Sequence, residues 1–173
     1  MGERAEPVTD EAFRRFVAER SAGLLRLAYL LTADRAGAED LVQNALVKAY
    51  LRWRHIETNP EAYVRRILVT VAADERRRAH HRHERAVDVL PETADGADPY
   101  AGVDGNVRLR SALAALPPRQ RAAVVLRHWV GLEVAEVAEL LGCSAVTVRS
   151  QTMRGLEKLR EAYGVAVEGE ARG

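Results

Sequence analysis

The sequence predicts an all-α protein made of two small helical domains that are joined by a flexible linker. Three observations lead to this prediction. Apolar residues recur at three- and four-residue spacing through two long stretches, the residues between those stretches are rich in Gly, Pro and Asp, and charge is unevenly distributed. A length of 173 residues suits one medium domain or two small ones.

The core has to be built mainly from Leu, Val and Ala, because aromatic residues make up only 5% of a chain that is 47% hydrophobic. The single cysteine, Cys143, cannot form an internal disulfide, and we interpret it as a small half-buried residue in a turn. No apolar run reaches the roughly 18–20 residues of a membrane span, and the polar first residues do not resemble a signal peptide. We therefore expect a cytoplasmic protein without membrane insertion.

Basic side chains are concentrated in two places, although the whole chain carries a net charge of only +1. Residues 65–85 contain seven basic and three acidic side chains, and residues 107–163 contain nine basic and five acidic ones. Between them, residues 86–106 contain five acidic side chains and no basic one. Two basic bodies separated by an acidic connector indicate a polyanion that is contacted twice.

The N-terminal domain, of three to four helices, is predicted over residues 13–85, after a polar tail at residues 1–12. Two helices are separated by a polar break from Thr32 to Gly37, and a third begins at Pro60 with Asn59 as its cap. Each helix carries an apolar stripe. The stripes are Leu24, Leu27, Ala28 and Leu31; Leu41, Val42, Ala45, Leu46 and Ala49; and Val64, Ile67, Leu68, Val71 and Ala72.

A C-terminal domain of four helices is predicted over residues 107–163, between the flexible linker at 86–106 and a tail at 164–173. Its boundaries follow from Pro, Gly and Ser positions between the apolar stripes. The first helix is expected to end at Pro117-Pro118, the second to start near Pro118, the third to run from about Val134 to Leu141, and the fourth from Ser144 to about Ala162.

The last two of these helices fit a helix-turn-helix. Such a motif needs a small residue where the helices cross, a turn that accepts a positive φ, and a capped second helix. Ala138 is the small residue and Gly142 is the turn. Ser144 can cap the second helix by accepting from a backbone N–H near Thr147, and Val148 should then point back into the core.

We interpret the outward side of this second helix as a surface that reads duplex DNA. Arg can pair with guanine edges or phosphates, Ser can serve either, and a helix N-terminus attracts phosphate. An ordinary helical hairpin with a solvated basic face is the alternative, but it does not explain the small residue and the cap together. The candidate DNA contacts are Ser144, Thr147, Arg149, Ser150, Met153 and Arg154.

A second candidate nucleic-acid surface lies on the third N-terminal helix. Arginine suits phosphate because its planar fork donates two parallel hydrogen bonds, and an exposed tyrosine can stack on an unpaired base. A solvated charge run is the alternative. The candidate residues are Tyr63, Arg65, Arg66, Arg76, Arg77 and Arg78.

Two further polar clusters are open to interpretation. Glu39, Asp40 and Gln43 either offset the dipole at a helix N-terminus or form a protein-docking face, and the sequence does not decide between these. His80, His81 and His83 lack a carboxylate at ligand spacing, so we interpret them as part of the basic surface and expect neither a metal nor a cofactor.

Taken together, these segments resemble the extracytoplasmic-function (ECF) class of bacterial sigma factors, which belong to the sigma-70 family. The resemblance covers roughly residues 13–83 and 107–162. It is carried by AEDLVQNALVKAY from Ala38, YVRRILVTVAADERRR from Tyr63, LPPRQRAAVVLRHWVGL from Leu116, and the helix-turn-helix. It implies a sigma region 2 domain over 13–85 and a sigma region 4 domain over 107–163.

The resemblance also implies roles for the candidate surfaces. Glu39, Asp40 and Gln43 would bind the coiled coil of the largest subunit of core RNA polymerase. The helix-turn-helix would read the double-stranded −35 promoter element. The loop before Pro60, with Asn59, and the helix from Tyr63 to Arg78, with Thr70, would capture the melted, single-stranded −10 element. An anti-sigma factor is a possible further partner.

Three positions depart from the family pattern. Thr70 stands where Asn is common, Glu133 stands where Ser or Thr caps a helix, and Leu46 stands where Phe is common. The first concerns the −10 contacts, and the other two concern capping and packing.

There are two alternatives to a sigma factor. One is a helix-turn-helix transcription regulator that works without polymerase and senses a ligand through its N-terminal domain. The other is a small metal-dependent hydrolase that uses Glu39, Asp40 and the histidines. The sequence contains no Ser-His-Asp set, phosphate loop or metal cage, so we do not expect an enzyme.

Overall fold

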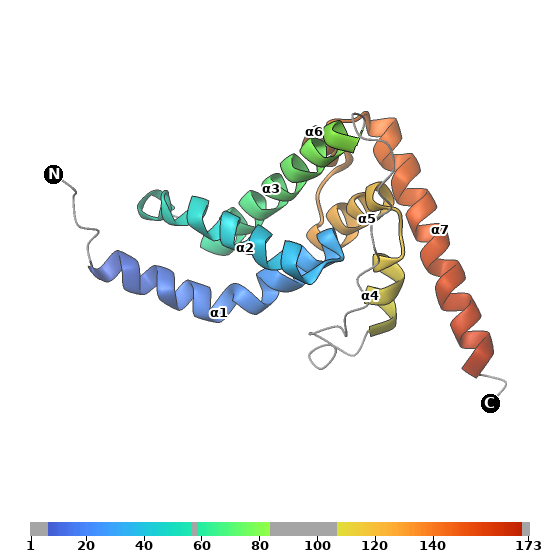
Figure 1. The fold of residues 1–173 in the computed structure, drawn as a ribbon, viewed down its shortest axis with the longest axis horizontal. Helices are drawn as coiled ribbons and strands as arrows, with labels where there is room; N and C mark the ends of the chain where they lie inside the picture. The colour runs from blue at the N-terminus through green and yellow to red at the C-terminus, as the bar shows by residue number, and fades with distance from the viewer. Residues whose placement is uncertain (1–6, 57–58, 84–106, 171–173) are drawn as a thin grey trace. The chain divides into compact units, whose positions relative to one another are not determined.

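The computed structural model describes residues 7–56, 59–83 and 107–170, and within these ranges every regular element is a helix (Figure 1). The chain divides into two compact units, Met1–Arg76 and Arg77–Gly173. The all-α prediction is confirmed. None of the described helices combines the length and the apolarity that crossing a membrane requires. The predicted linker at 86–106 lies outside the described residues, and the predicted domain boundaries stay predictions.

The first unit consists of two helices that lie side by side and a third that is joined to each of them by a polar contact. Its elements are α1 (Pro7–Thr32), α2 (Arg35–Tyr50), a short 3-10 turn η1 (Trp53–His55) and α3 (Pro60–His83), whose last turns pass the unit boundary. The apolar stripes predicted for these helices are buried, except that Ile67 and Ala72 are only half-buried.

Helix α1 begins at Pro7, inside the segment that was expected to be a tail. Proline fits the first helical turn because its missing N–H has no partner there in any case, and Asp10 adds an acidic side chain near the helix start. The break before α2 is likewise shorter than expected. It is limited to Ala33, at φ +55°, and Asp34, whose carboxylate accepts the Gly37 N–H at 2.6 Å and so starts α2 at Arg35.

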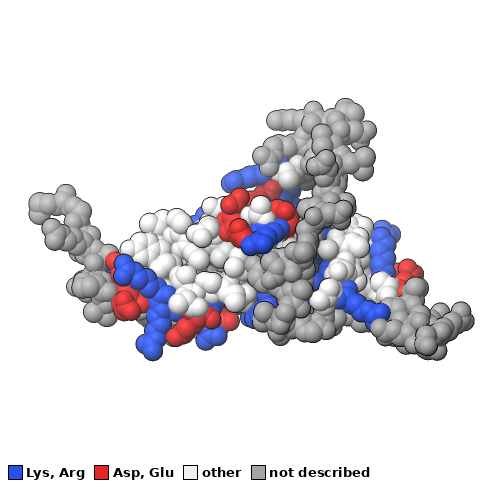
Figure 2. Space-filling model, turned by 60° about the horizontal axis from the view of Figure 1, so that its bottom comes forward, with Lys and Arg blue, Asp and Glu red and all other residues white. Residues whose placement is uncertain are grey.

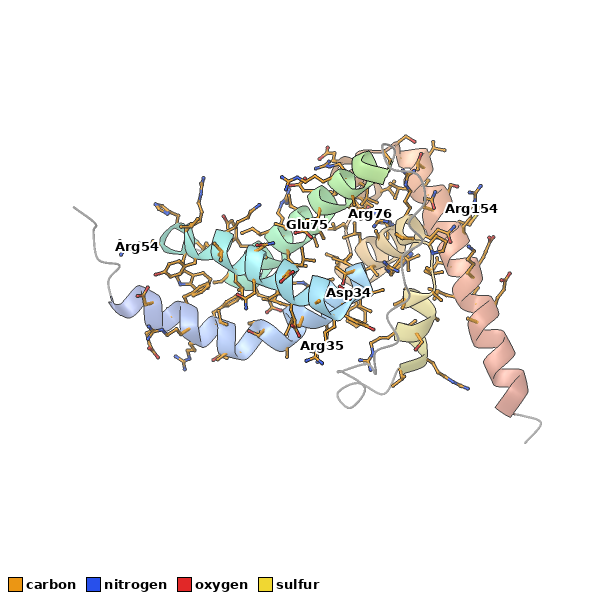
Figure 3. All side chains as sticks on the ribbon, viewed as in Figure 1. Asp34, Arg35, Arg54, Glu75, Arg76 and Arg154 are labelled. Atoms are coloured by element: carbon orange, nitrogen blue, oxygen red, sulfur yellow. The ribbon has the colours of Figure 1, made fainter. Side chains whose placement is uncertain are left out.

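Helix α3 is fastened at both ends of its buried face. Glu61 pairs with Arg20 of α1 at 3.2 Å, and the Asn44 amide of α2 donates to Glu75 at 3.4 Å (Glu75 is labelled in Figure 3). Exposed contacts of this kind contribute at most about 1 kcal/mol each. Between them lie buried side chains such as Leu68, each of which stabilises the fold by roughly 1.5–3 kcal/mol. Apolar burial therefore holds α3, and the polar contacts set its register.

The second unit contains the four predicted helices in the predicted order. Its elements are α4 (Val107–Ala114), α5 (Pro118–Val124), a π-helical turn η2 (Val125–Val130), α6 (Val134–Leu141) and α7 (Ala145–Glu170). The expected bounds of α6 are confirmed. The expected end of α7 near Ala162 is too early, since the helix continues to Glu170. The second predicted helix changes to the wider π geometry at Val125 before Gly131, at φ +82°, ends it.

A buried arginine joins α4 to α5. The guanidinium of Arg121 is almost fully buried, and its Nη1 donates to the carbonyl oxygens of Ala114 at 3.2 Å and Leu116 at 3.4 Å. The last carbonyls of a helix have no partner within the helix. Arg121 therefore satisfies the C-terminal end of α4 from inside the core.

Helices α5 and α7 cross at Gly155. This glycine is buried, and a Cβ placed on it would lie 2.6 Å from Cγ2 of Val124 and 3.4 Å from the carbonyl oxygen of Gln120. Any larger residue would push the two helices apart, so close packing of α7 depends on the missing side chain.

We predict that Gly155→Ala lowers the free energy of unfolding by about 1–3 kcal/mol, because it overpacks this crossing. The measurement is urea denaturation followed by far-ultraviolet circular dichroism. Gly23→Ala is the matched control: Gly23 is exposed on α1, and an added Cβ has only Arg26 Nη2 near it, at 4.0 Å. The control should raise stability by roughly 0.5–1 kcal/mol. Equal effects of the two substitutions would contradict the crossing argument.

Candidate functional site

The turn between α6 and α7 has the geometry that a helix-turn-helix requires. Gly142 adopts φ +63°, and the N–H of Cys143 donates to the carbonyl oxygen of Ala138 at 3.0 Å. The Ser144 hydroxyl accepts the Thr147 N–H at 3.1 Å, as expected. Val148 is 1% exposed and points into the core, also as expected. The predicted turn at Gly142, cap at Ser144 and buried side chain at Val148 are confirmed.

The first helix of the motif, α6, is capped by glutamates. The backbone N–H of Glu133 donates to Oε2 of Glu136 at 2.9 Å. This hydrogen bond caps the start of α6. The family pattern has Ser or Thr at position 133, and the helix start remains capped with Glu133 there. The Arg127 side chain also binds the residues before α6. Its Nη1 donates to the Leu132 carbonyl oxygen and lies 3.8 Å from the Glu133 carboxylate.

The outer strip of α7 is flanked by two exposed arginines. Val146 and Met153 are 71% and 56% exposed, on the side away from the buried Val148. Arg149 and Arg154 are also exposed, but five residues correspond to about 140° around a helix. They therefore lie on either flank of the strip that contains Met153, at the two edges of the outward side of the helix.

The arginines of α7 are available to an anion, whereas the hydroxyls at its start are already engaged. Among the described residues, none accepts a hydrogen bond from the guanidinium of Arg149 or Arg154 (Arg154 is labelled in Figure 3). Ser144 Oγ and Thr147 Oγ1 share a hydrogen bond at 2.9 Å in addition to the cap. Ser150, the remaining candidate, is half-buried. The structure thus favours the two arginines and Met153 as contacts that need no rearrangement.

The candidate residues of α3 divide into two groups. Tyr63, Arg66, Thr70 and Arg77 are exposed, and their spacing of three, four and seven residues places them on one face of the helix. We call these four residues the α3 strip. Arg65 and Arg76 are half-buried and lie on a different side, while Arg78 is exposed; the side chains of His80, His81 and His83 lie outside the described atoms.

Two further candidates at α3 have local partners. Asn59, at φ +45°, caps the helix by accepting the Ala62 N–H at 3.1 Å, as predicted. The Thr70 hydroxyl donates to the carbonyl oxygen of Arg66 at 2.8 Å. Because its proton is engaged, Thr70 offers only acceptor lone pairs to a ligand, whereas the Asn common at this position in the family also donates.

An aromatic cluster that the sequence analysis missed braces the turn before α3. Phe13 lies 5.1 Å from Tyr50 and 5.0 Å from Trp53, and Phe16 lies 5.0 Å from Trp53, between ring centroids. The Tyr50 hydroxyl donates to Asp10 Oδ1 at 2.8 Å. The start of α1 therefore holds η1, whose Arg54 is exposed (Figure 3). The sequence signal for this cluster was the three-residue spacing of Phe13 and Phe16 and of Tyr50 and Trp53, in a chain with few aromatic residues.

The acidic candidates lie on an exposed face of α2. Glu39, Asp40 and Gln43 are all exposed, and Glu39 pairs with Nε of Arg35 at 3.0 Å. The same face continues into Val47 and Leu51, at four-residue spacing from Gln43, which are 59% and 75% exposed. We call these five residues, Glu39, Asp40, Gln43, Val47 and Leu51, the α2 face. Sequence analysis missed its two apolar members.

The charge of the described surface is mixed. On the side drawn in Figure 2, acidic and basic side chains lie next to one another and leave pale areas between them. A net charge of +1 agrees with this distribution. Any nucleic-acid contact must therefore come from particular strips, such as those of α7 and α3, and not from a uniformly basic surface.

Comparisons with known proteins agree with the division into two units. Residues 16–82 match the family model described as Sigma-70 region 2, and residues 106–159 match the model described as Sigma-70, region 4. The RNA polymerase sigma-E factor of Streptomyces coelicolor is 39% identical over 153 residues, which cover 86% of this chain and 84% of that protein. The ECF RNA polymerase sigma factor SigM of Mycobacterium tuberculosis is 32% identical over 159 residues, covering 90% and 76%.

A solved structure has a similar fold. It is the sigma factor RpoE from Bartonella quintana, crystallised in complex with the anti-sigma factor NepR. The TM-score is 0.63 at 24% sequence identity, and the match covers 90% of this chain and 98% of that chain. At this identity the likeness concerns the fold alone.

The brace at Tyr50 generates a prediction about pH. The hydrogen bond to the Asp10 carboxylate, together with its negative charge, raises the pKa of Tyr50 above its usual 10.0. The contact therefore stabilises the fold below pH 10, and this contribution is lost as pH rises through the raised pKa. The absorbance titration of the wild type minus that of Tyr50→Phe should give a midpoint above 10, and Asp10→Asn should move that midpoint back toward 10. An unchanged midpoint in Asp10→Asn would show that the carboxylate is not the cause.

Proposed function

The chain belongs to the ECF class of sigma-70 family sigma factors, and on that premise we propose that it binds core RNA polymerase and directs it to promoters. The observation that carries the proposal is the capped start of α7, which presents two flanking arginines on a surface that the core leaves free. In this proposal α7 reads the −35 element and the first unit captures the −10 element.

At the −35 element, α7 lies in the major groove of duplex DNA. The start of a recognition helix approaches base edges, so of the two arginines Arg149 lies nearer the bases, and Arg154 follows at the other flank. A guanidinium binds guanine bidentately or pairs with a phosphate. Each phosphate contact releases counterions, so binding weakens as salt increases.

At the −10 element, the α3 strip holds a single strand. Tyr63 stacks on an unpaired base, Arg66 pairs with a phosphate, and the aromatic cluster holds η1 in place for contact with an extruded base. Stacking contributes roughly 1–3 kcal/mol per base, and extruding a base costs a few kcal/mol. The free energy gained by stacking at the −10 element is therefore about equal to the cost of extruding the base. The −35 contacts supply the remaining binding energy.

The α2 face is the proposed contact with polymerase. Its acidic end suits basic residues and its apolar end suits a hydrophobic stripe, a combination that an amphipathic helix of the largest subunit's coiled coil presents. Holding the two DNA-binding units on one polymerase raises the effective concentration of the second contact once the first has formed. The phosphodiester chemistry stays with polymerase, and this chain contributes binding, in the cytoplasm where polymerase works.

A further partner is proposed from a structural neighbour. RpoE of Bartonella quintana was crystallised with an anti-sigma factor. A protein of that kind that covers the exposed Val47 and Leu51 of this chain competes directly with polymerase for the α2 face.

The experiment that tests the function is reconstitution. Purified full-length protein is added to sigma-free core polymerase with genomic DNA, and transcription starts are mapped across the genome. We expect a discrete set of starts that share two sequence elements and that are absent without the protein. No new start in the presence of the protein would contradict the proposal.

Arg149→Ala and Arg154→Ala should each weaken binding at the −35 element by about 1–3 kcal/mol if the contact is to a base edge. Protection of the promoter from nuclease by the holoenzyme measures this. Lys158→Ala is the control, since Lys158 is exposed farther along the same helix and its loss removes the same charge. Unchanged protection in both arginine variants would argue against the α7 surface.

Asp40→Arg should abolish co-purification with core polymerase, because it places a positive charge at the acidic end of the α2 face. Asp40 is the better choice than Glu39, which already shares its carboxylate with Arg35. Glu11→Arg is the matched reversal, at an exposed position on a different helix, α1. Circular dichroism should be the same for both variants. Equal retention of polymerase by both would rule out the α2 face as the contact.

A further inference from the structure

Val146 stands on the outer strip of α7 at a position that the fold does not require. It is 71% exposed, two residues before the buried Val148. Ser150 and Met153 follow it at four and seven residues, so the three positions share one side of the helix over about 10 Å. The strip between the two arginines thus begins and ends with an exposed apolar side chain.

Among the described residues of the second unit, none covers the exposed side of this valine. Valine is a poorer helix former than alanine, and its side chain gains little from burial when 71% of it stays exposed. Its β-branched side chain is nearly fixed in one rotamer in a helix, so little side-chain entropy is lost when a partner packs against it. Val146 is therefore suited to an apolar contact that forms only on binding.

The chemistry of the major groove limits what that contact is. Base edges there present hydrogen-bond donors and acceptors, and the one apolar group among the four bases is the C5 methyl of thymine. Val146 is the second residue of α7, and the first residues of a recognition helix are those that reach base edges. Resting on the proposed function, we propose that Val146 selects a thymine in the −35 element by packing against its C5 methyl group.

Met153 is the other apolar residue of the strip, but it is two turns farther from the start of α7 and its side chain is flexible. Its flexible side chain can pack against groups of different shape in the groove, so we do not expect it to select one base. The test must therefore couple one thymine to Val146 and not to Met153.

The experiment uses the full-length protein on core polymerase and proceeds in two steps. Bound duplexes are first recovered from a pool that is randomised over the −35 region. Each thymine of the recovered sequence is then replaced singly by deoxyuridine, which lacks only the C5 methyl. At one thymine we expect wild-type binding to weaken about fourfold, the equivalent of one buried methyl group.

The variants assign the effect to Val146. Val146→Ala should bind the thymine duplex about fourfold more weakly and should no longer distinguish thymine from deoxyuridine at that position. Val146→Thr keeps one methyl and should retain part of the discrimination. Met153→Ala, and Val107→Ala on α4, where Val107 is 43% exposed, should discriminate as the wild type does. Because Val146 is exposed, its substitution leaves the core unchanged.

Two kinds of failure are distinguishable. A pool from which no sequence is enriched overturns the proposed function and this inference together. An enriched sequence overturns this inference alone if it contains no thymine that the wild type distinguishes from deoxyuridine. The same holds if Val146→Ala keeps the full wild-type discrimination at every thymine.

Discussion

The structure of the second unit depends on one close crossing, that of α5 and α7 at Gly155. With no side chain at this position, Val124 and the backbone at Gln120 approach α7 directly. The crossing fixes which side of α7 is buried, and Val148 and Leu159 follow on that side. The opposite side, over two turns from Val146 onward, is then left exposed by the part of the unit that the structure describes. The proposed DNA-reading surface is thus the part of a long helix that its own core leaves exposed.

The first unit carries two proposed binding surfaces, the α3 strip and the α2 face, on a small core. Burial of side chains such as Leu68 supplies most of the stability, while exposed pairs such as Arg20–Glu61 mainly set register. The aromatic contacts of Trp53 with Phe13 and Phe16 fasten η1 to the first turns of α1. Stability and proposed function thus occupy opposite sides of the same helices.

Much of the fold could be predicted because apolar spacing and local capping act over a few residues. The stripes of the first unit, the cap at Asn59, the turn at Gly142 and the cap at Ser144 all follow from neighbours in the chain, and each is confirmed. The start of α1 was not predicted. It depends partly on Asp10 bonding to Tyr50, forty residues away, and periodicity carries no information about such a contact.

The candidate site was predictable in composition but not in arrangement. Residue types identified the basic strips, yet only the helix geometry separates the exposed Arg66 from the half-buried Arg65, and places Arg149 and Arg154 on opposite flanks. The apolar end of the α2 face was missed because an exposed leucine such as Leu51 has no signature in the sequence. The exposure of this leucine can be recognised only when the buried residues of the unit are known.

The central claim is that the outer strip of α7 meets duplex DNA at the −35 element. Photocrosslinking tests it most directly, with a photoreactive amino acid in place of the exposed Met153 in the full-length protein on core polymerase. Mapping of the crosslinked base should place it within the −35 element of a promoter identified by start-site mapping. Crosslinks that form only to polymerase, or to DNA outside that element, would contradict the account.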